Sequence, residues 1–374
     1  MTSHKNPLVS IVMPVYNGEQ FIADAIRSVL AQTYPHWTLT IGNNHSKDRT
    51  LAIAEEFATK DSRIRVVTYP SFVSVVESHN NAFRLVPEDA TYCRALGADD
   101  LLFPEALEKM VEVAERHPTV GLVLSYVLAG NTVVVPGYKY PDTFVPGMEV
   151  GRLRFLQNTS LFAGPSSCML RASIVRAKQA FYNPVNYYGD LEAYIELLQR
   201  HDFGFVHQVL SYTRKGPDSR TTSYLDRVFA QTAMRILEIN KFGAHFLSPE
   251  ERSRILRKAK RHYYGFLGAS VWEFRGREFW DYHRRHVKEM GYPMRYRLVT
   301  WYALLRLFDL IGNPLRTIRG LGRRFAAWRN RHTVMREESH GPAPKSKQQG
   351  AETDAESTTE MSAVPAVARL RRPQ

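Results

Sequence analysis

Cysteine is scarce in this chain of 374 residues, which contains only Cys93 and Cys168. Both stand in apolar segments, so we expect two buried thiols and neither a disulfide framework nor a cysteine-based metal site. The 13 histidines form no His-Glu-X-X-His pair, which excludes that zinc-protease motif. A Gly-X-X-X-X-Gly-Lys-Ser/Thr loop is also missing, as is a Gly-X-Gly-X-X-Gly motif after the first predicted strand. The usual fingerprints of P-loop and dinucleotide-binding proteins are therefore absent.

Long hydrophobic runs are equally scarce. Residues 118–138 contain 21 positions without Asp, Glu, Lys or Arg, which is long enough for a membrane span. However, residues 120–127 are β-branched and aromatic, residues 129–131 form a turn signal, and residues 132–135 are β-rich again. This pattern predicts two strands joined by a turn. The first six residues are polar and precede an apolar stretch of only strand length, so we see no secretory signal and expect a cytoplasmic protein.

The chain does contain a regular alternation of β-rich and helix-periodic segments near its N-terminus. The predicted strands are residues 8–13, 37–41 and 64–67, and the predicted helices are residues 21–31 and 50–59. Such an alternation implies βαβ units, and hence an α/β fold with a mainly parallel sheet whose strand C-termini share one rim. The hydrophobic content of 44% is sufficient for a sizeable core.

Two adjacent carboxylates follow a further apolar run that begins near Tyr92. Asp99 and Asp100 stand directly after this predicted strand and shortly before Pro104. In an open α/β sheet, ligands bind beyond the carboxyl ends of the strands, so acids at this position can hold a divalent cation against a phosphorylated substrate. The alternative is that the two acids only cap the helix that opens near Pro104.

Several further segments belong to one ordered pattern: residues 10–19 (SIVMPVYNGE), 31–35 (AQTYP), 98–104 (ADDLLFP), 164–167 (GPSS) with Arg171 behind it, 189–192 (GDLE) and 203–214 (FGFVHQVLSYTR). Taken in this order, they resemble the family 2 glycosyltransferases over about the first 225 residues. The resemblance implies a GT-A fold, which is Rossmann-like, together with a nucleotide-sugar donor, Mg²⁺ or Mn²⁺, and inversion at the anomeric carbon. The Gln-X-X-Arg-Trp motif of membrane-embedded processive synthases is missing, so we expect a non-processive enzyme of the bacterial polysaccharide or glycolipid type.

The resemblance assigns the metal site to the two adjacent acids. Asp99 matches the last Asp of the family's Asp-X-Asp signature, and Asp100 follows it. We therefore expect Asp99 to be the chief metal ligand and to contact the donor, with Asp100 supporting it. Gly97 stands where the signature has its first Asp, which leaves one carboxylate fewer near the ion.

The expected catalytic base is Asp190. It matches the Asp of the family's Glu-Asp pair, whereas Gly189 stands where the Glu usually is. A carboxylate next to the acceptor hydroxyl can accept its proton as that hydroxyl attacks the donor. The alternative role for Asp190 is that of N-cap for a helix predicted over residues 191–200.

The donor is expected in the loops after the first two strands, where Tyr16 can stack on the nucleobase and the main chain around Pro14 can contact its edge. Asn17 and Glu19 are second-line candidates. The further donor candidates are Asn43, which replaces a family Asp that accepts a hydrogen bond from the base, and Asn80, for which a buried packing amide is the alternative.

The C-terminal part of the chain is strongly basic. Residues 251–336 contain 21 Lys and Arg against six Asp and Glu, and we divide the chain into a catalytic domain (1–225), a basic helical region (226–332) and a disordered tail (333–374). Within the basic helical region, the pattern of residues 298–331 predicts amphipathic helices that can lie on an anionic membrane surface. This predicts a peripheral protein on the cytoplasmic face of the inner membrane. The alternative is that the same apolar stripe packs on the catalytic domain.

The predicted function is sugar transfer from a nucleotide-sugar donor to a hydroxyl of a saccharide or lipid-linked acceptor, in the synthesis of cell-surface polysaccharide or glycolipid. Two alternatives come from other classes. A catalytically silent relative that binds a sugar nucleotide or acts as a scaffold is compatible with the substitutions at Asn43, Gly97 and Gly189. A nucleic-acid-binding protein would suit the pI of about 9.7, but no helix-turn-helix, zinc-finger or RRM signature supports it.

Overall fold

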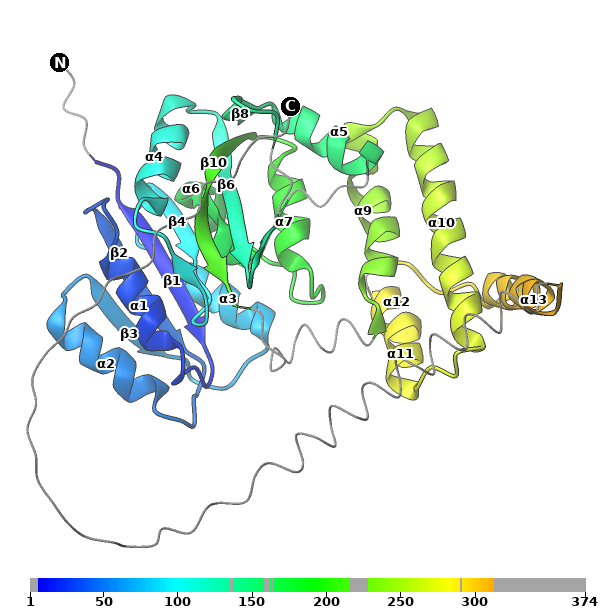
Figure 1. Cartoon of the computed structure of the whole chain (residues 1–374), viewed down its shortest axis with the longest axis horizontal. Helices are drawn as coiled ribbons and strands as arrows, with labels where there is room; N and C mark the ends of the chain where they lie inside the picture. Colours follow the sequence, from blue (N-terminus) through cyan, green and yellow to red (C-terminus); the bar gives the residue numbers. More distant parts are fainter. Residues whose placement is uncertain are drawn as a thin grey trace, which may run out of the picture. The chain divides into compact units, whose positions relative to one another are not determined.

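A computed structural model describes residues 6–134, 138–157, 162, 164–214, 228–289 and 291–312, with the side chains of residues 309–311 excepted. In these residues ten strands form one sheet, with the order β3-β2-β1-β4-β9-β6-β10-β5, while β7 pairs with β6 and β8 with β10 (Figure 1). The strands are β1 (Val9–Val15), β2 (Trp37–Asn43), β3 (Ile64–Thr68), β4 (Tyr92–Ala95), β5 (Leu101–Leu102), β6 (Val120–Ala129), β7 (Thr132–Val134), β8 (Phe144–Val145), β9 (Cys168–Arg171) and β10 (Asp202–Thr213).

The N-terminal half of the sheet is parallel. Strand β1 pairs in parallel with β2 and β4, and β2 pairs in parallel with β3. Six of the seven residues of β1 are buried, as expected for a parallel strand that is covered on both faces. The predicted α/β class and the strands at 8–13, 37–41 and 64–67 are thereby confirmed, each to within two residues at either end.

The other half of the sheet is mixed, so the sheet as a whole is less parallel than the sequence indicated. Strand β9 is antiparallel to both β4 and β6, while β10 is parallel to β6 and antiparallel to β5 and β8. The short helix η1 (Pro165–Ser167) explains the reversal. Ser166 accepts a hydrogen bond from the Gly97 N–H just beyond the end of β4, so β9 starts at that rim and runs back. The predicted pair of strands within 120–135 is confirmed as β6 and β7, which are antiparallel.

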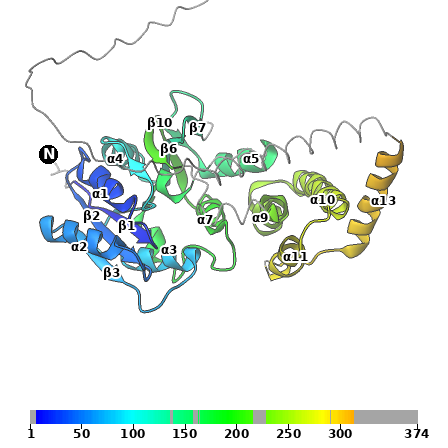
Figure 2. The same ribbon diagram turned by 60° about the horizontal axis from the view of Figure 1, so that its bottom comes forward.

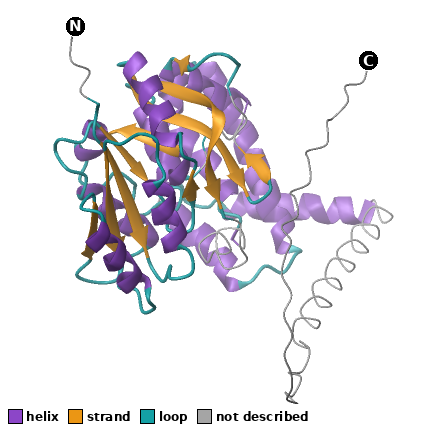
Figure 3. Cartoon of the chain, turned by 60° about the vertical axis from the view of Figure 1, so that its left-hand side comes forward, coloured by secondary structure: helices purple, strands orange, loops and turns teal. Residues whose placement is uncertain are grey.

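Helices cover both faces of the sheet (Figure 3). On one face Ile11 and Met13 share a buried apolar cluster with α1 and α4, and on the other Val12 shares a cluster with α3 and α7. This division follows from the alternation of side chains along a strand. The helices of this part are α1 (Ile22–Leu30), α2 (Thr50–Lys60), α3 (Val75–Arg84), α4 (Ala106–Arg116), α5 (Gly147–Gln157), α6 (Ala172–Arg176) and α7 (Gly189–Leu197).

A helical region follows, as predicted. It contains α9 (Gln231–Phe246), α10 (Pro249–Val271), α11 (Arg277–Asp281), the π-helix η2 (Tyr282–His286), α12 (Val287–Glu289) and α13 (Tyr296–Gly312). Figure 2 shows α9 between α7 and α10. Phe242 and Phe246 of α9 belong to the same buried cluster as α5 and α7, so the helical region packs directly on the sheet domain.

Some predicted features of the C-terminal part lie outside the described residues: the boundary at 225/226, the part of the amphipathic helices of 298–331 that follows residue 312, and the tail from 333. The predicted helix at 298–311 corresponds to α13. Among the described helices, none combines the length and the hydropathy that a membrane crossing requires.

Candidate active site

The loops after β1 and β2 are tied together by hydrogen bonds. The Asn17 N–H donates to Ser46 Oγ at 3.0 Å, and Asn17 Oδ1 accepts from the Lys47 N–H at 2.8 Å. Glu19 Oε2 likewise accepts from the Arg49 N–H at 2.9 Å. The side chains of Asn17 and Glu19 therefore fix the shape of the predicted donor loop at the carboxyl ends of the strands.

Tyr16 is exposed at this rim and has an aromatic neighbour. Its ring meets that of Phe72 edge to face, with centroids 4.8 Å apart, and the two residues are 44% and 60% exposed. An exposed pair of aromatic rings in a ligand loop offers a surface on which a nucleobase can stack. Sequence reasoning missed Phe72; the only signal was an aromatic residue in the loop that follows the third strand.

The two predicted amide ligands are buried and already hydrogen-bonded. Asn43 is 2% exposed; its Nδ2 donates to Thr68 Oγ1, and its Oδ1 accepts from the Ser46 N–H at 3.1 Å. Asn80 is 1% exposed and makes a reciprocal pair with the main chain of Tyr182, at 2.8 and 2.9 Å. The contacts of Asn80 correspond to the alternative of a buried packing amide.

The two adjacent acids differ sharply in their surroundings. Asp99 is exposed, whereas Asp100 is 8% exposed. A Cβ at position 97 would lie 3.0 Å from a carboxylate oxygen of each, so Gly97 leaves both acids close to the same small volume. Burial raises the pKa of Asp100 to about 6, with a smaller rise from Asp99, although hydrogen bonds from Ser166, Arg214 and Thr213 oppose the shift.

The residues at this corner fit a divalent cation that takes further ligands from the substrate. Mg²⁺ in such sites is commonly held by one or two carboxylates together with substrate phosphates. Asp99 is the accessible carboxylate, while Asp100 is buried and accepts hydrogen bonds from Ser166, Thr213 and Arg214. The described residues contain no group of three or more His, Cys, Asp or Glu that could hold an ion alone.

Arg214 is a second residue that sequence reasoning left without a role. It directly follows β10, and its main-chain N–H donates to Asp100 Oδ1 at 3.3 Å. Its guanidinium lies over the ring of Phe21, 4.2 Å from the centroid, and its buried Nε has no hydrogen-bond partner among the described residues. Arg214 thus brings a cation close to the acid corner.

Asp190 lies in the first turn of α7 and does not cap it; Tyr188 is the N-cap residue. The alternative prediction of an N-cap at Asp190 is therefore wrong by two positions, because the helix begins at Gly189. Asp190 is half-buried, and burial raises its pKa to about 6, against the opposing effect of hydrogen bonds from the Leu191 N–H and its own N–H.

Close packing around position 189 explains why a glycine stands there. A Cβ at this position would lie 3.1 Å from the Cβ of Tyr182 and 3.2 Å from the carbonyl oxygen of Asn183. These contacts are tighter than ordinary van der Waals distances, so a glutamate does not fit here unless the 182–183 segment shifts. Glu192 occupies the same neighbourhood, buried and bonded to Asn183, Asn186 and Lys241.

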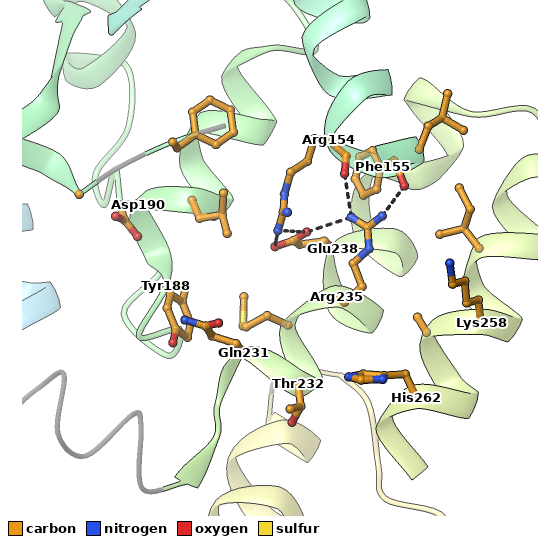
Figure 4. A pocket seen from close by; sticks show the side chains of 17 residues that line it. Arg154, Phe155, Tyr188, Asp190, Gln231, Thr232, Arg235, Glu238, Lys258 and His262 are labelled. Carbon is orange, nitrogen blue, oxygen red and sulfur yellow. Dashed lines mark hydrogen bonds and ion pairs between the residues drawn. The ribbon is translucent and has the colours of Figure 1, made fainter. Parts of the chain in front are cut away.

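A cavity of about 750 Å³ opens beside Asp190 (Figure 4). Side chains from α5, α7, α9 and α10 line it, together with Phe162 and Gly164. Gly164 immediately precedes η1, whose Ser166 hydrogen-bonds Asp100 and the Gly97 N–H. One short segment therefore connects the acid corner with the cavity that holds Asp190.

Residues 10–177 match the family model described as "Glycosyl transferase family 2". The putative glycosyltransferase EpsE of Bacillus subtilis is 30% identical over 180 residues, which is 48% of this chain and 61% of that protein. "UDP-Glc:alpha-D-GlcNAc-diphosphoundecaprenol beta-1,3-glucosyltransferase WfgD" of Escherichia coli is 30% identical over 135 residues, covering 36% and 52%. The matched region thus spans about half to three fifths of these relatives.

Solved structures agree on the fold. The S. aureus TarS 1–349 structure in complex with UDP-GlcNAc superposes with a TM-score of 0.57 at 14% identity, covering 78% of this chain and 82% of that one. At this identity the similarity concerns the fold alone.

Proposed function

From the membership of residues 10–177 in glycosyl transferase family 2, we propose that the chain transfers one sugar from a nucleotide-sugar donor to a hydroxyl group of a saccharide or lipid-linked acceptor, with inversion. The setting is the synthesis of cell-surface polysaccharide or glycolipid. The observation that carries the proposal is the link through residues 164–168 between a two-carboxylate corner at the sheet rim and a cavity that contains a third carboxylate, Asp190.

The donor nucleotide lies on the loops after β1, β2 and β3. Tyr16 and Phe72 stack on the base, and the main chain near Pro14 contacts its edge. Asn17 and Glu19 act by holding the loop in shape, since their side chains already bond the 46–49 segment. Asn43 and Asn80, which are buried, support this site through their hydrogen bonds to neighbouring segments. Arg214 binds the diphosphate.

Asp99, supported by Asp100, would hold Mg²⁺ or Mn²⁺. The bound ion would supply electrostatic stabilisation of the negative charge on the departing nucleotide. The chain itself contributes the exposed carboxylate of Asp99 and keeps Asp100 in place through Ser166, Thr213 and Arg214.

Asp190 accepts the proton of the acceptor hydroxyl. The hydroxyl oxygen forms a bond to the anomeric carbon, the bond from that carbon to the phosphate oxygen breaks, and the nucleotide leaves. A base with a pKa of about 6 is ionised at neutral pH and still accepts a proton more readily than an ordinary aspartate does.

The acceptor is presented at an anionic membrane surface, with the protein peripheral on its cytoplasmic face. Trp301, Leu304, Leu305 and Phe308 support this, because they form an exposed apolar stripe on α13 with helical spacing. The proposal extends over residues 298–331, of which those after 312 lie beyond the described part. An apolar stripe within a basic region is typical of interfacial helices.

The test compares Asp99→Ala with Asp190→Asn in the full chain. The melting temperature is measured with UDP-, GDP-, CMP- and dTDP-sugars, with and without Mn²⁺, followed by transfer assays with the donor that binds. We expect Asp99→Ala to remove the metal-dependent shift, and Asp190→Asn to retain it while transfer falls roughly 10²- to 10⁴-fold.

Two outcomes would contradict the proposal. If no donor stabilises the wild-type protein in any metal, a catalytically silent relative becomes the better description. If both variants unfold at lower temperature to the same extent and lose donor binding together, the two carboxylates have structural roles instead.

A further inference from the structure

The cavity beside Asp190 belongs jointly to the sheet domain and the helical region. Asp190 and Leu191 come from α7, Phe155 comes from α5, and Met234 and Lys258 come from α9 and α10. In Figure 4 these elements surround the space from several sides. Its volume of about 750 Å³ is within the range of small-molecule sites, and its walls are partly apolar and partly charged.

One wall carries a buried cluster of two arginines and one glutamate. Arg154 Nη2 lies 2.8 Å from both carboxylate oxygens of Glu238, and Arg235 Nη1 lies 3.8 Å from Glu238 Oε2. The side chain of Glu238 is 2% exposed and those of the arginines are 11% and 15% exposed. Two guanidinium groups therefore share a single carboxylate in surroundings where charge is poorly solvated.

The positive charge of Arg235 is only partly compensated by its other hydrogen bonds. Arg235 also donates to the carbonyl oxygens of Arg154 and Phe155 near the end of α5, the first at 3.1 Å. Burial, together with the neighbouring Arg154, still lowers the pKa of Arg235 to about 10, although Glu238 opposes the shift. Counted over its three side chains alone, the cluster carries a net positive charge that an anion in the cavity would offset.

A third cation on the walls comes from α10. Lys258 and His262 are one turn apart on α10 and both line the cavity. Among the described residues, Lys258 has no carboxylate within ion-pair distance. Among the described residues that line the cavity, the acids are Asp190 and Glu238, so this part of the lining carries more positive than negative charge.

We propose that this cavity binds the acceptor and that the acceptor carries an anionic group, a phosphate or a carboxylate, bound by Lys258 and His262 on the side of the Arg154–Glu238–Arg235 cluster. The inference rests on the proposed glycosyl transfer and specifies its acceptor class. The apolar side chains of Phe155, Leu191 and Met234 contact the uncharged part of the acceptor, and its hydroxyl faces Asp190. The helical region is then part of the active site and determines which acceptor is used.

The experiment measures binding of three soluble probes to the full chain by calorimetry: glucose 1-phosphate, glucuronic acid and methyl glucoside. The variant is Lys258→Glu, and the matched control is Arg257→Glu, which makes the same charge change on the adjacent exposed residue outside the cavity. We expect wild type and Arg257→Glu to bind at least one anionic probe roughly tenfold more tightly than methyl glucoside, and Lys258→Glu to lose this preference. A preference for the phosphate or the carboxylate identifies which anion the acceptor carries.

The proposal is overturned if wild type binds neither anionic probe more tightly than methyl glucoside, or if Arg257→Glu loses the preference to the same extent as Lys258→Glu. Donor binding separates this failure from a failure of the proposed function. If Mn²⁺-dependent stabilisation by a sugar nucleotide persists in wild type and in Lys258→Glu while no anion preference is found, only the acceptor assignment is wrong. If donor stabilisation is absent altogether, the enzyme proposal itself fails.

Discussion

At the scale of single residues, the candidate site depends on carboxylates in unequal environments. Asp99 is exposed at the rim, Asp100 is buried behind it, and Asp190 is half-buried in a separate cavity. Groups of the same chemical type thus receive different properties from their surroundings, as general acid-base and metal chemistry require. Burial, which disfavours the charged form, is the largest cause of the raised pKa of both Asp100 and Asp190.

The raised pKa of Asp190 predicts a pH dependence of transfer. The base is active when ionised, so the rate should fall as the pH decreases through about 6, two units above the value for an ordinary aspartate. The measurement is kcat/KM between pH 5 and pH 9 with saturating metal, and donor binding over the same range is the control. A rate that is constant down to pH 5 would contradict the assignment of Asp190.

The close approach of Gly97 to both acids predicts the effect of adding a third carboxylate. In Gly97→Asp the new Cβ lies 3.0 Å from the oxygens of Asp99 and Asp100, and three negative charges repel one another when no cation is present. We expect a lower melting temperature than wild type in EDTA and a larger stabilisation by Mn²⁺. Gly97→Ala separates crowding from charge, since it adds the Cβ alone; equal responses of the two variants to Mn²⁺ would count against a metal site.

The exposed pair of Tyr16 and Phe72 predicts a loss of donor affinity when either ring is removed. Stacking of a base on an aromatic side chain contributes about 1–3 kcal/mol, so Tyr16→Ala and Phe72→Ala should each weaken donor binding roughly tenfold. Titration with the donor measures this, and Tyr140→Ala, which removes an exposed ring 77% accessible to solvent, is the control. Unchanged affinity in both variants would exclude stacking at this rim.

At the scale of elements, the ends of strands and helices bring the site together. Strands β1, β2 and β4 deliver the donor loops and the acids to one rim, and η1 returns the chain to that rim before β9. Helix α7 places Asp190 in its first turn, while α5, α9 and α10 close the cavity. Contacts between α5 and α9 are therefore expected to affect both the stability of the helical region and the shape of this cavity.

The Arg154–Glu238–Arg235 cluster joins α5 to α9, and its carboxylate should be important for folding. Glu238→Gln removes the carboxylate that both buried guanidinium groups contact, so we expect a loss of about 3–5 kcal/mol in the free energy of unfolding. Urea denaturation measures the effect. The control is Glu56→Gln, which breaks an exposed pair with Lys60 and should leave the midpoint of urea unfolding unchanged. A similarly small effect for Glu238→Gln would show that the cluster is well solvated.

At the scale of the whole molecule, charge and exposed apolar surface are concentrated in the C-terminal part. Basic residues outnumber acidic ones 21 to six between positions 251 and 336. Helix α13 in this region exposes Trp301, Leu304, Leu305 and Phe308 on one stripe. This combination is typical of surfaces that bind anionic bilayers.

The stripe on α13 predicts membrane binding that can be removed without unfolding. Trp301→Glu and Phe308→Glu should reduce binding to vesicles that contain anionic lipid, measured by sedimentation, while the melting temperature stays at the wild-type value. Phe274→Glu is the control, because Phe274 is 89% exposed outside the stripe. If the stripe variants bind vesicles as well as wild type does, α13 is not the contact surface.

Many of the strands and helices could be predicted because their positions depend on patterns among neighbouring residues. The strand and helix positions up to residue 68 follow from side-chain periodicity, which reports which face of each element is buried. Asp99, Asp100 and Asp190 were singled out by ordered motifs, and the structure places the first two at the sheet rim and the third beside the cavity; their chemical roles stay predictions. The mixed pairing of β9 was not foreseen, because strand direction depends on where the preceding segment ends in space.

The sequence by itself determined the elements, the resemblance to a family over the N-terminal part, and the candidate acids, since each of these depends on neighbouring residues or on ordered motifs along the chain. Only the tertiary structure revealed that Phe72 joins Tyr16, that Arg214 reaches the acid corner, and that Arg235 and Lys258 line a cavity with Asp190. Those pairs are separated by 45 to 114 positions in the sequence. No local pattern indicates which residues so far apart in the sequence become neighbours in space. They come together when the sheet and the helical region pack against each other and bury their apolar faces.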